Sequence, residues 1–208
     1  MDELLIECER MNKKYGVNFA MRVIEFDFEQ IQDVSTIKVA MNKIKKAKDY
    51  FDSHESQFIT DDKDREIINE KNYIIVCEDT GLSFTRDNQD SVKFPYNALL
   101  QMCNGDYHRT NKELVRQYGK RDAYFTTSYG TYNSKTDLFT VSSHGQEFTV
   151  AENYAEDGSG FGFDYMIIPK SANGVFADKT LAQINEKSNL FPKPRLILLR
   201  QILTELMQ

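Results

Sequence analysis

Strand-like and helix-like segments alternate along this chain, and that alternation limits the possible folds more than any other feature. Val17–Phe28 and Tyr73–Cys77 are rich in β-branched and aromatic residues, as strands are. Residues 123–130 and 138–141 have the same character and flank a short polar stretch, which predicts a hairpin. Because a hairpin makes its strands antiparallel while interleaved helices favour parallel neighbours, the sequence predicts an α/β fold with a mixed sheet.

Helices are indicated where apolar residues recur every three or four positions. The second such segment has Asp33 or Ser35 as its candidate N-cap. We expect helices over 4–15, 34–44, 99–118 and 194–206, and further strands over 147–150 and 165–168. Residues 52–70 are polar and dense in charge, so we expect an exposed connection or insertion in which a short helix can form.

Composition and charge narrow the class of protein. The 208 residues include 14 Phe and 11 Tyr, enough for a real core, and the length suggests a single domain over 1–208. Lys and Arg number 26 against 32 Asp and Glu, a net charge of −6, whereas duplex nucleic-acid binders show the opposite bias. We therefore expect no nucleic-acid partner.

The expected compartment is the cytoplasm. No apolar run approaches the roughly 20 residues that a membrane span needs, and the acidic start lacks the pattern of a secretory signal. Cys8, Cys77 and Cys103 are widely spaced and form no CxxC pair. They fit a reducing cytosol better than disulfides or zinc, so we expect a soluble protein without a membrane partner.

Two carboxylates directly follow the strand-like run Tyr73–Cys77, in the sequence Glu78-Asp79-Thr80-Gly81. We expect the strand to end there, and ligands of open α/β sheets bind beyond the carboxyl ends of strands. Adjacent carboxylates in such a place can hold a divalent cation, and one can act as general base toward water. An acidic β-turn with solvated side chains, in which Gly81 supplies a permissive backbone angle, explains the same residues.

A glycine-rich segment, Gly158–Asp164, is the second candidate. Its small residues let a ligand approach the backbone, and Phe161 and Phe163 offer flat faces on which a base can stack. The segment lacks the Gly-Lys-Ser/Thr ending of a phosphate loop. A glycine-rich loop whose aromatic side chains fill the core is the alternative.

Cations form the third group. Lys38 lies on the second expected helix, and Lys187, Lys193 and Arg195 lie near the start of the last one. Together with a helix N-terminus, such cations can bind an anion, although most surface lysines are only solvated. The lysines of Lys43–Lys48 are expected on a solvated helix face without a role.

Several short motifs, taken in order, resemble those of the inosine triphosphate pyrophosphatases, which remove deaminated purine nucleotides. The apolar strand before Glu78-Asp79-Thr80-Gly81 is similar to one family motif, and Gly160–Asp164 followed by Ile167-Ile168-Pro169 resembles another. Further likenesses, also in order, are Arg121–Phe125, Phe176-Ala177-Asp178 and Glu186-Lys187-Ser188. The likeness covers about residues 70–200 and, less closely, 3–47.

The resemblance implies an elongated α/β fold with a central mixed sheet flanked by helices, a nucleotide cleft and a homodimer. It also implies Mg²⁺-dependent hydrolysis of a nucleoside triphosphate, with deaminated or modified purines as one expected substrate class. The resemblance implies that Asp79 activates water and helps to hold the metal, with Glu78 and Glu29 as further metal ligands. Lys38 and Lys187 are implied to contact the phosphates or the nucleotide, and Arg195 is also implied as a site residue. For the base, the resemblance implies that Phe161 stacks on it and that Asp164 hydrogen-bonds to it. A small shift would put Gln30 or Asp27 in the place of Glu29.

Two departures from the family pattern leave two functions open. The family normally begins with a strand and a Thr-Gly-Asn-x-x-Lys loop that grips the phosphates, whereas this chain begins at the following helix. The family's Ser-His-Arg motif is replaced by Phe191-Pro192-Lys193-Pro194-Arg195, in which only Arg195 persists. The leading hypothesis is a nucleotide pyrophosphatase. The alternative is a nucleotide-binding or regulatory protein that has lost turnover, and a third is an interaction module that keeps only the scaffold.

Overall fold

The computed structural model describes residues 2–24, 31, 33, 35–86, 89–94, 100–101, 103–160, 162–187 and 194–207. Within them lies a five-stranded sheet with the order β2-β1-β3-β4-β5, all of whose described neighbours pair antiparallel. Its strands are β1 (Ile74–Arg86), β2 (Gln89–Phe94), β3 (Asp122–Asn133), β4 (Leu138–Val150) and β5 (Ile167–Pro169). The helices are α1 (Asp2–Tyr15), α2 (Thr36–Ser53), α3 (Glu55–Phe58), α4 (Asp62–Asn69), α6 (Tyr107–Tyr118), α7 (Leu181–Lys187) and α8 (Pro194–Glu205), with 3₁₀ turns η1 (Gly162–Tyr165) and η2 (Gly174–Phe176).

Strands β3 and β4 form the predicted hairpin. Their turn is closed by the Asn133 side-chain oxygen, which accepts the backbone N–H of Lys135 at 2.9 Å, and Asp137 adopts a φ of +56°. The two strands pair from Asp122 to Asn133 without interruption. The strand predicted over 147–150 is therefore the far end of β4 and not a separate element.

Strand β1 is much longer than the sequence predicts. It pairs with β3 at every position from Ile74 to Phe84, so Glu78 to Gly81 lie in the middle of the strand and the predicted end at Glu78 is wrong. The turn tendency of Asp-Thr-Gly is local, and a continuous partner strand overrides it. The strand is not buried along its whole length, because Val76 is exposed.

The strand predicted over Val17–Phe28 is wrong for its described part. Residues 17–24 form no strand, and 25–28 lie outside the described residues. The backbone here is satisfied by side chains: Asn12 on α1 both donates to and accepts from the backbone of Phe19, at 2.7 and 2.9 Å. Further along, Arg22 donates to Asp64 on α4 at 2.5 Å. These contacts tie the segment to helices instead of to the sheet.

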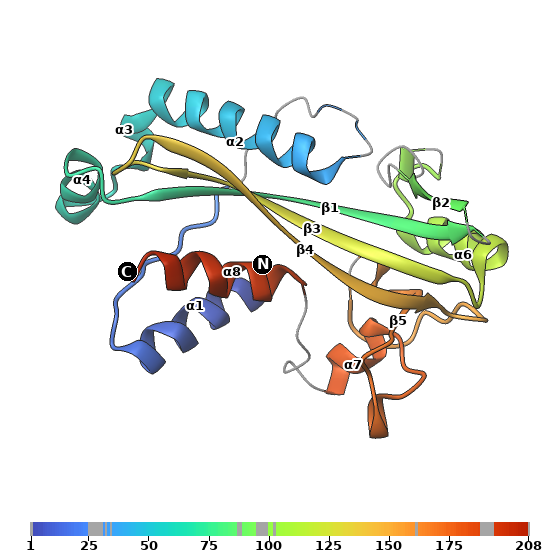
Figure 1. Ribbon diagram of the computed structural model, residues 1–208. Helices are drawn as coiled ribbons and strands as arrows, with labels where there is room; N and C mark the ends of the chain where they lie inside the picture. The colour runs from blue at the N-terminus through green and yellow to red at the C-terminus, as the bar shows by residue number, and fades with distance from the viewer. Residues whose placement is uncertain are drawn as a thin grey trace.

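Helix α2 covers one face of the sheet at close range (Figure 1). Of the two candidate caps, Asp33 and Ser35, it is Ser35 that caps the helix, its side chain accepting the N–H of Lys38. Two glycines of the sheet make room for the helix. A Cβ at Gly130 would lie 2.5 Å from the Ala40 carbonyl oxygen, and one at Gly81 would lie 2.8 Å from the Thr36 methyl. A larger residue at either position would push the helix off the sheet.

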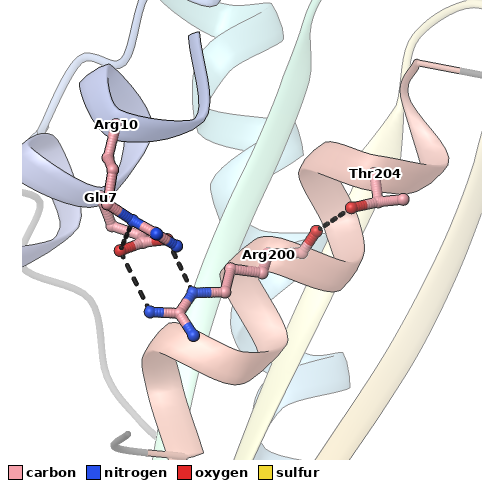
Figure 2. Close-up of polar contacts among 4 residues, drawn as sticks. All are labelled: Glu7, Arg10, Arg200 and Thr204. Carbon is pink, nitrogen blue, oxygen red and sulfur yellow. Dashed lines mark hydrogen bonds and ion pairs between the residues drawn. The ribbon is translucent and has the colours of Figure 1, made fainter. Parts of the chain in front are cut away.

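Helices α1 and α8 lie together against the opposite face (Figure 1). Their shared core holds Cys8, Met11, Tyr129, Leu198, Leu199, Ile202 and Leu203. Figure 2 shows how the helices are joined at the surface: Arg10 and Arg200 both donate to the Glu7 carboxylate, with shortest distances of 2.7 and 2.6 Å. Pro194 takes the first position of α8, where its missing N–H costs nothing.

A second core lies toward the other end of the same face. There α6, η1, β5 and α7 pack beneath the sheet around Phe84, Phe148, Phe163, Met166 and Ile167. The helix predicted over 99–118 is interrupted, because Asn104 and Gly105 have positive φ and Asp106 then caps α6. Residues 52–70, expected as a connection with short helix, carry α3 and α4.

The α/β class with a long central sheet flanked by helices is thus confirmed, whereas the strand pairs that the structure describes are all antiparallel and do not show the mixed sheet that the sequence predicts. In the described part of the chain, no helix is long and apolar enough to cross a membrane.

Candidate functional site

The two carboxylates of the acidic pair point to opposite faces of the sheet. Successive residues of a strand alternate between its faces. Asp79 accordingly reaches Lys43 of α2, with Oδ1 to Nζ at 3.0 Å. Glu78 reaches Arg195 of α8 on the other face, with Oε1 to Nη2 at 2.7 Å. The structure therefore does not bring the pair together around one ion.

The Asp79 face is built from α2 and the middle of the sheet. The Lys43 ammonium donates to Asp79 and to the Glu78 carbonyl oxygen, the latter at 2.9 Å. In the ladder, Asp79 stands opposite Ser128, which stands opposite Ser143. The Ser128 hydroxyl lies 2.7 Å from that of Thr36 on α2 and 3.0 Å from that of Ser143. A largely buried carboxylate thus lies beside a cation and a row of hydroxyls.

Lys43 is the functional candidate that the sequence analysis assigned to a solvated face. Both it and Asp79 are largely buried. The signal that could have identified it is its place on the helix: it lies three residues after the buried Ala40 and directly before the buried Ile44. Lysine stems pack along apolar surfaces while the ammonium finds a polar partner, and here the partner is on β1.

Cys77 shares the Asp79 face and is chemically quiet. Burial raises the pKa of its thiol to about 11, although the Lys43 charge acts in the opposite direction. The thiolate is the nucleophilic form, so Cys77 is almost wholly unreactive at neutral pH. On this face the Asp79 carboxylate is therefore a stronger candidate for a chemical role than the Cys77 thiol.

The Glu78 face is a chain of polar contacts under the start of α8. Arg195 in the first turn of α8 binds the Glu78 carboxylate, which also accepts the Thr80 hydroxyl at 3.1 Å. The Thr80 hydroxyl lies 3.2 Å from that of Thr127 on β3. Glu78 is thus held by one cation and one hydroxyl, and its contacts are those of an anchor for α8.

The glycine-rich turn lies on the Glu78 face of the sheet. Phe163 is buried in the core and meets Phe125 edge-on, with ring centroids 5.7 Å apart at 89°. It is therefore a core residue and offers no face to a base, as in the alternative interpretation of the turn. Asp164 is partly exposed and accepts a hydrogen bond from Asn185 of α7 at 3.3 Å.

The remaining predicted site residues are not gathered at one point. Lys38 is 70% exposed and pairs with Asp33 at 3.5 Å near the start of α2. Lys187 is the last residue of α7, and nothing is described of its side chain. Glu29 and Phe161 lie outside the described residues. Asp79 and Lys38 thus belong to the side of the sheet that α2 covers, and Glu78, Asp164 and Arg195 to the other side.

A divalent ion bound at the Asp79 face would need further ligands besides the Asp79 carboxylate. Among the described residues no three His, Cys, Asp or Glu side chains converge. Magnesium in nucleotide sites is commonly held by one or two carboxylates together with the substrate's own phosphates. Asp79 can supply one such carboxylate, and the adjacent hydroxyl row is oxygen-rich, so the chemistry of this face suits a magnesium–phosphate complex.

Comparison with known proteins gives one family and several solved structures of similar fold. A family model described as the Ham1 family matches residues 6–190. No curated protein matches the chain. A nucleoside-triphosphatase (dITP/XTP pyrophosphatase) from Mycobacterium abscessus has a similar structure, with TM-score 0.54 and 18% identity over 100% of this chain and 95% of that one. The Ham1 protein of Staphylococcus aureus is similar with TM-score 0.56 and 18% identity, over 88% of this chain and 83% of that one. At such identities the likeness concerns the fold.

Proposed function

The chain belongs to the Ham1 family, and on that premise we propose that it hydrolyses a nucleoside triphosphate to the monophosphate and pyrophosphate. The observation that carries the proposal is the position of Asp79: a largely buried carboxylate in the middle of the sheet, directly beside the Lys43 ammonium. The Mycobacterium abscessus protein of similar fold is named as a pyrophosphatase of dITP and XTP, which supports the reaction type.

Asp79 is the proposed general base. The reaction requires a water molecule to attack the α-phosphorus while the bond to the bridging oxygen of pyrophosphate breaks. A carboxylate can hold that water and accept its proton. Lys43 is the proposed cation for the phosphates. An ammonium has three N–H donors, and Asp79 and the Glu78 carbonyl use two of them, so a third is available to a phosphate oxygen.

We also propose Mg²⁺ as cofactor. When bound, such an ion neutralises phosphate charge and polarises the phosphoryl group. On this chain Asp79 would hold it, and Glu29 would do so from outside the described residues. Glu78 is not proposed as a ligand of that ion, since its carboxylate faces α8.

Nucleotide recognition is proposed for residues on the other side of the sheet, which a nucleotide cleaved at Asp79 would have to reach past the edge of β1. Asp164, which Asn185 already orients, would hydrogen-bond the base, and Phe161 would stack on it. Arg195 and Lys187, and Lys38 on the α2 side, are the proposed cations for the rest of the nucleotide. A deaminated or modified purine, a homodimer and a cytoplasmic location are further parts of this proposal.

Loss of turnover is the second candidate, and one observation favours it. Both carboxylates of the acidic pair are held in ion pairs, Asp79 with Lys43 and Glu78 with Arg195. If those pairs persist when a nucleotide binds, no carboxylate reaches the water. The protein would then bind a nucleotide without cleaving it.

One experiment separates the two. Purified protein is incubated with Mg²⁺ and a panel of ordinary and deaminated ribo- and deoxyribonucleoside triphosphates, and pyrophosphate release and melting temperature are followed in the same samples. Pyrophosphatase activity predicts release from at least one member, abolished by chelation. Binding alone predicts a raised melting temperature without release. No release and no shift with any nucleotide would refute both.

A further inference from the structure

A buried amide outside the proposed catalytic face contacts the glycine-rich turn. Asn111 lies on α6, and its side chain is completely buried (0% exposed). Its Nδ2 donates a hydrogen bond to the backbone carbonyl of Gly162, 51 residues further along the chain. The contact thus joins α6 to the first residue of η1.

The accepting carbonyl lies at the point where the backbone changes direction. Gly162 has a φ of +58°, a left-handed conformation that favours glycine, and it begins η1. Phe163 follows and is locked in the core against Phe125, and Asp164 comes next, with Asn185 on its carboxylate. The orientation of the Gly162 peptide therefore sets the direction from which Asp164 leaves the turn.

Burying the Asn111 side-chain amide at this position is destabilising. Its Oδ1 is buried and has no hydrogen-bond partner among the residues that the structure describes. A buried polar atom left in that state is destabilising, whereas an apolar side chain of similar size would carry no such cost. What an apolar side chain could not do is donate to the Gly162 carbonyl.

We propose that Asn111 is a positioning residue, which holds the Gly162 peptide so that Asp164 is presented to the nucleotide. The inference rests on the proposed function for its consequence in catalysis. Its structural half, that Asn111 fixes the turn, stands on the contact alone. Asn111 itself does not touch the substrate.

Two variants and one control test this. Asn111→Leu removes the donor and keeps the volume. Asn111→Asp keeps the shape but donates only when protonated. Thr110→Val is the matched control, because Thr110 is the neighbouring buried polar residue of α6, and its hydroxyl donates to Asp106 within the helix and not to the turn.

The first measurement is amide hydrogen exchange by mass spectrometry, without nucleotide. We expect faster exchange in peptides over 160–166 in Asn111→Leu and unchanged exchange there in Thr110→Val. Equal protection of those peptides in Asn111→Leu and the wild type would overturn the proposal. So would equal loss in both variants, because it would mean a general loosening of α6.

The second measurement is the steady-state kinetics of the best nucleotide from the panel. Asn111→Leu is expected to raise KM about tenfold, the equivalent of one lost hydrogen bond, with kcat changed much less. In Asn111→Asp, a buried carboxyl is protonated more readily, so KM should return toward the wild-type value as the pH falls from 8 to 5.5 or so. The wild type, which carries the same His108 and Tyr154 near the start of α6, is measured over the same pH range as the reference.

The outcomes for the two proposals differ. A wild-type protein that releases no pyrophosphate refutes the proposed function, while hydrogen exchange still decides whether Asn111 holds the turn. An active wild type whose KM is unchanged in Asn111→Leu refutes the positioning role alone.

Discussion

Replacing Glu7 with Gln is expected to destabilise the protein in a way that depends on pH. The Glu7 side chain is 7% exposed and accepts hydrogen bonds from two guanidinium groups, whose side chains are 51% exposed for Arg10 and 37% for Arg200 (Figure 2). Glutamine keeps the shape of this carboxylate but removes its charge and places an amide N–H₂ against the guanidinium groups.

The magnitude follows from that burial. Removing one member of a buried ion pair costs about 3–5 kcal/mol, but exposed pairs contribute less than about 1 kcal/mol. Because Glu7 is buried and both arginines are partly solvated, we expect about 2 kcal/mol, within the range for hydrogen bonds to charged groups. For a chain of this length that lowers the melting temperature by about 4–8 °C.

The pH dependence supplies the stricter test. Burial would raise the pKa of Glu7, but hydrogen bonds from Arg10 and Arg200, together with their charges, outweigh it and lower the pKa below 4.5. A carboxylate whose pKa is lowered by folding stabilises the protein above its unfolded-state pKa, and this contribution is lost as the pH falls through the folded-state value. The difference between wild type and Glu7→Gln should therefore be full at pH 7 and shrink below about pH 4.5.

The assay is thermal unfolding followed by circular dichroism between pH 3.5 and pH 8. Glu9→Gln is the control: it removes the same charge from an exposed position of the same helix, and we expect it to change the melting temperature by less than about 2 °C. An equal effect of the two substitutions at pH 7, or a Glu7→Gln effect that does not shrink in acid, would show that the ion pair does not hold α1 to α8.

Three further substitutions test the site and the fold. Asp79→Asn should lower pyrophosphate release by about 10²–10⁴-fold, and it should also lower the melting temperature because the largely buried Lys43 ammonium loses its carboxylate; full activity would exclude Asp79 as the base. Lys43→Met should raise KM for the nucleotide about tenfold or more because it removes a cation while keeping the stem, and an unchanged KM would place the phosphates elsewhere. Gly130→Ala should lower the free energy of unfolding, measured by denaturant titration, by about 1–3 kcal/mol, since the added methyl would lie 2.5 Å from the Ala40 carbonyl oxygen. An unaltered denaturant midpoint would mean that α2 moves freely on the sheet.

The elements that the sequence predicts well are those decided by neighbouring residues. Asn133 closes the β3–β4 turn through its own side chain, and Ser35 caps α2 through the N–H three residues on. Both contacts lie within a few positions, so local pattern is sufficient. By contrast, Asp-Thr-Gly is a turn sequence that lies within β1 because β3 pairs with it residue for residue.

The candidate site shows the same division. The motif is sufficient to make Asp79 the candidate base, but the opposite directions of Glu78 and Asp79 follow only once the strand is known to continue. Lys43 was missed because its place beside Ala40 and Ile44 becomes a signal only when the side of α2 that meets the sheet is known. Phe163 likewise packs in the core instead of offering a stacking surface because of its contact with Phe125, which lies 38 positions earlier in the chain.

The pairing of α1 with α8 has a consequence for biosynthesis. Cys8 and Met11 leave the ribosome long before their partners Leu198, Leu199, Ile202 and Leu203, which lie far later in the chain. At ordinary translation speeds the interval is on the order of ten seconds or more. Throughout that time the apolar face of α1, and Tyr129 on the nascent sheet, are not covered by α8.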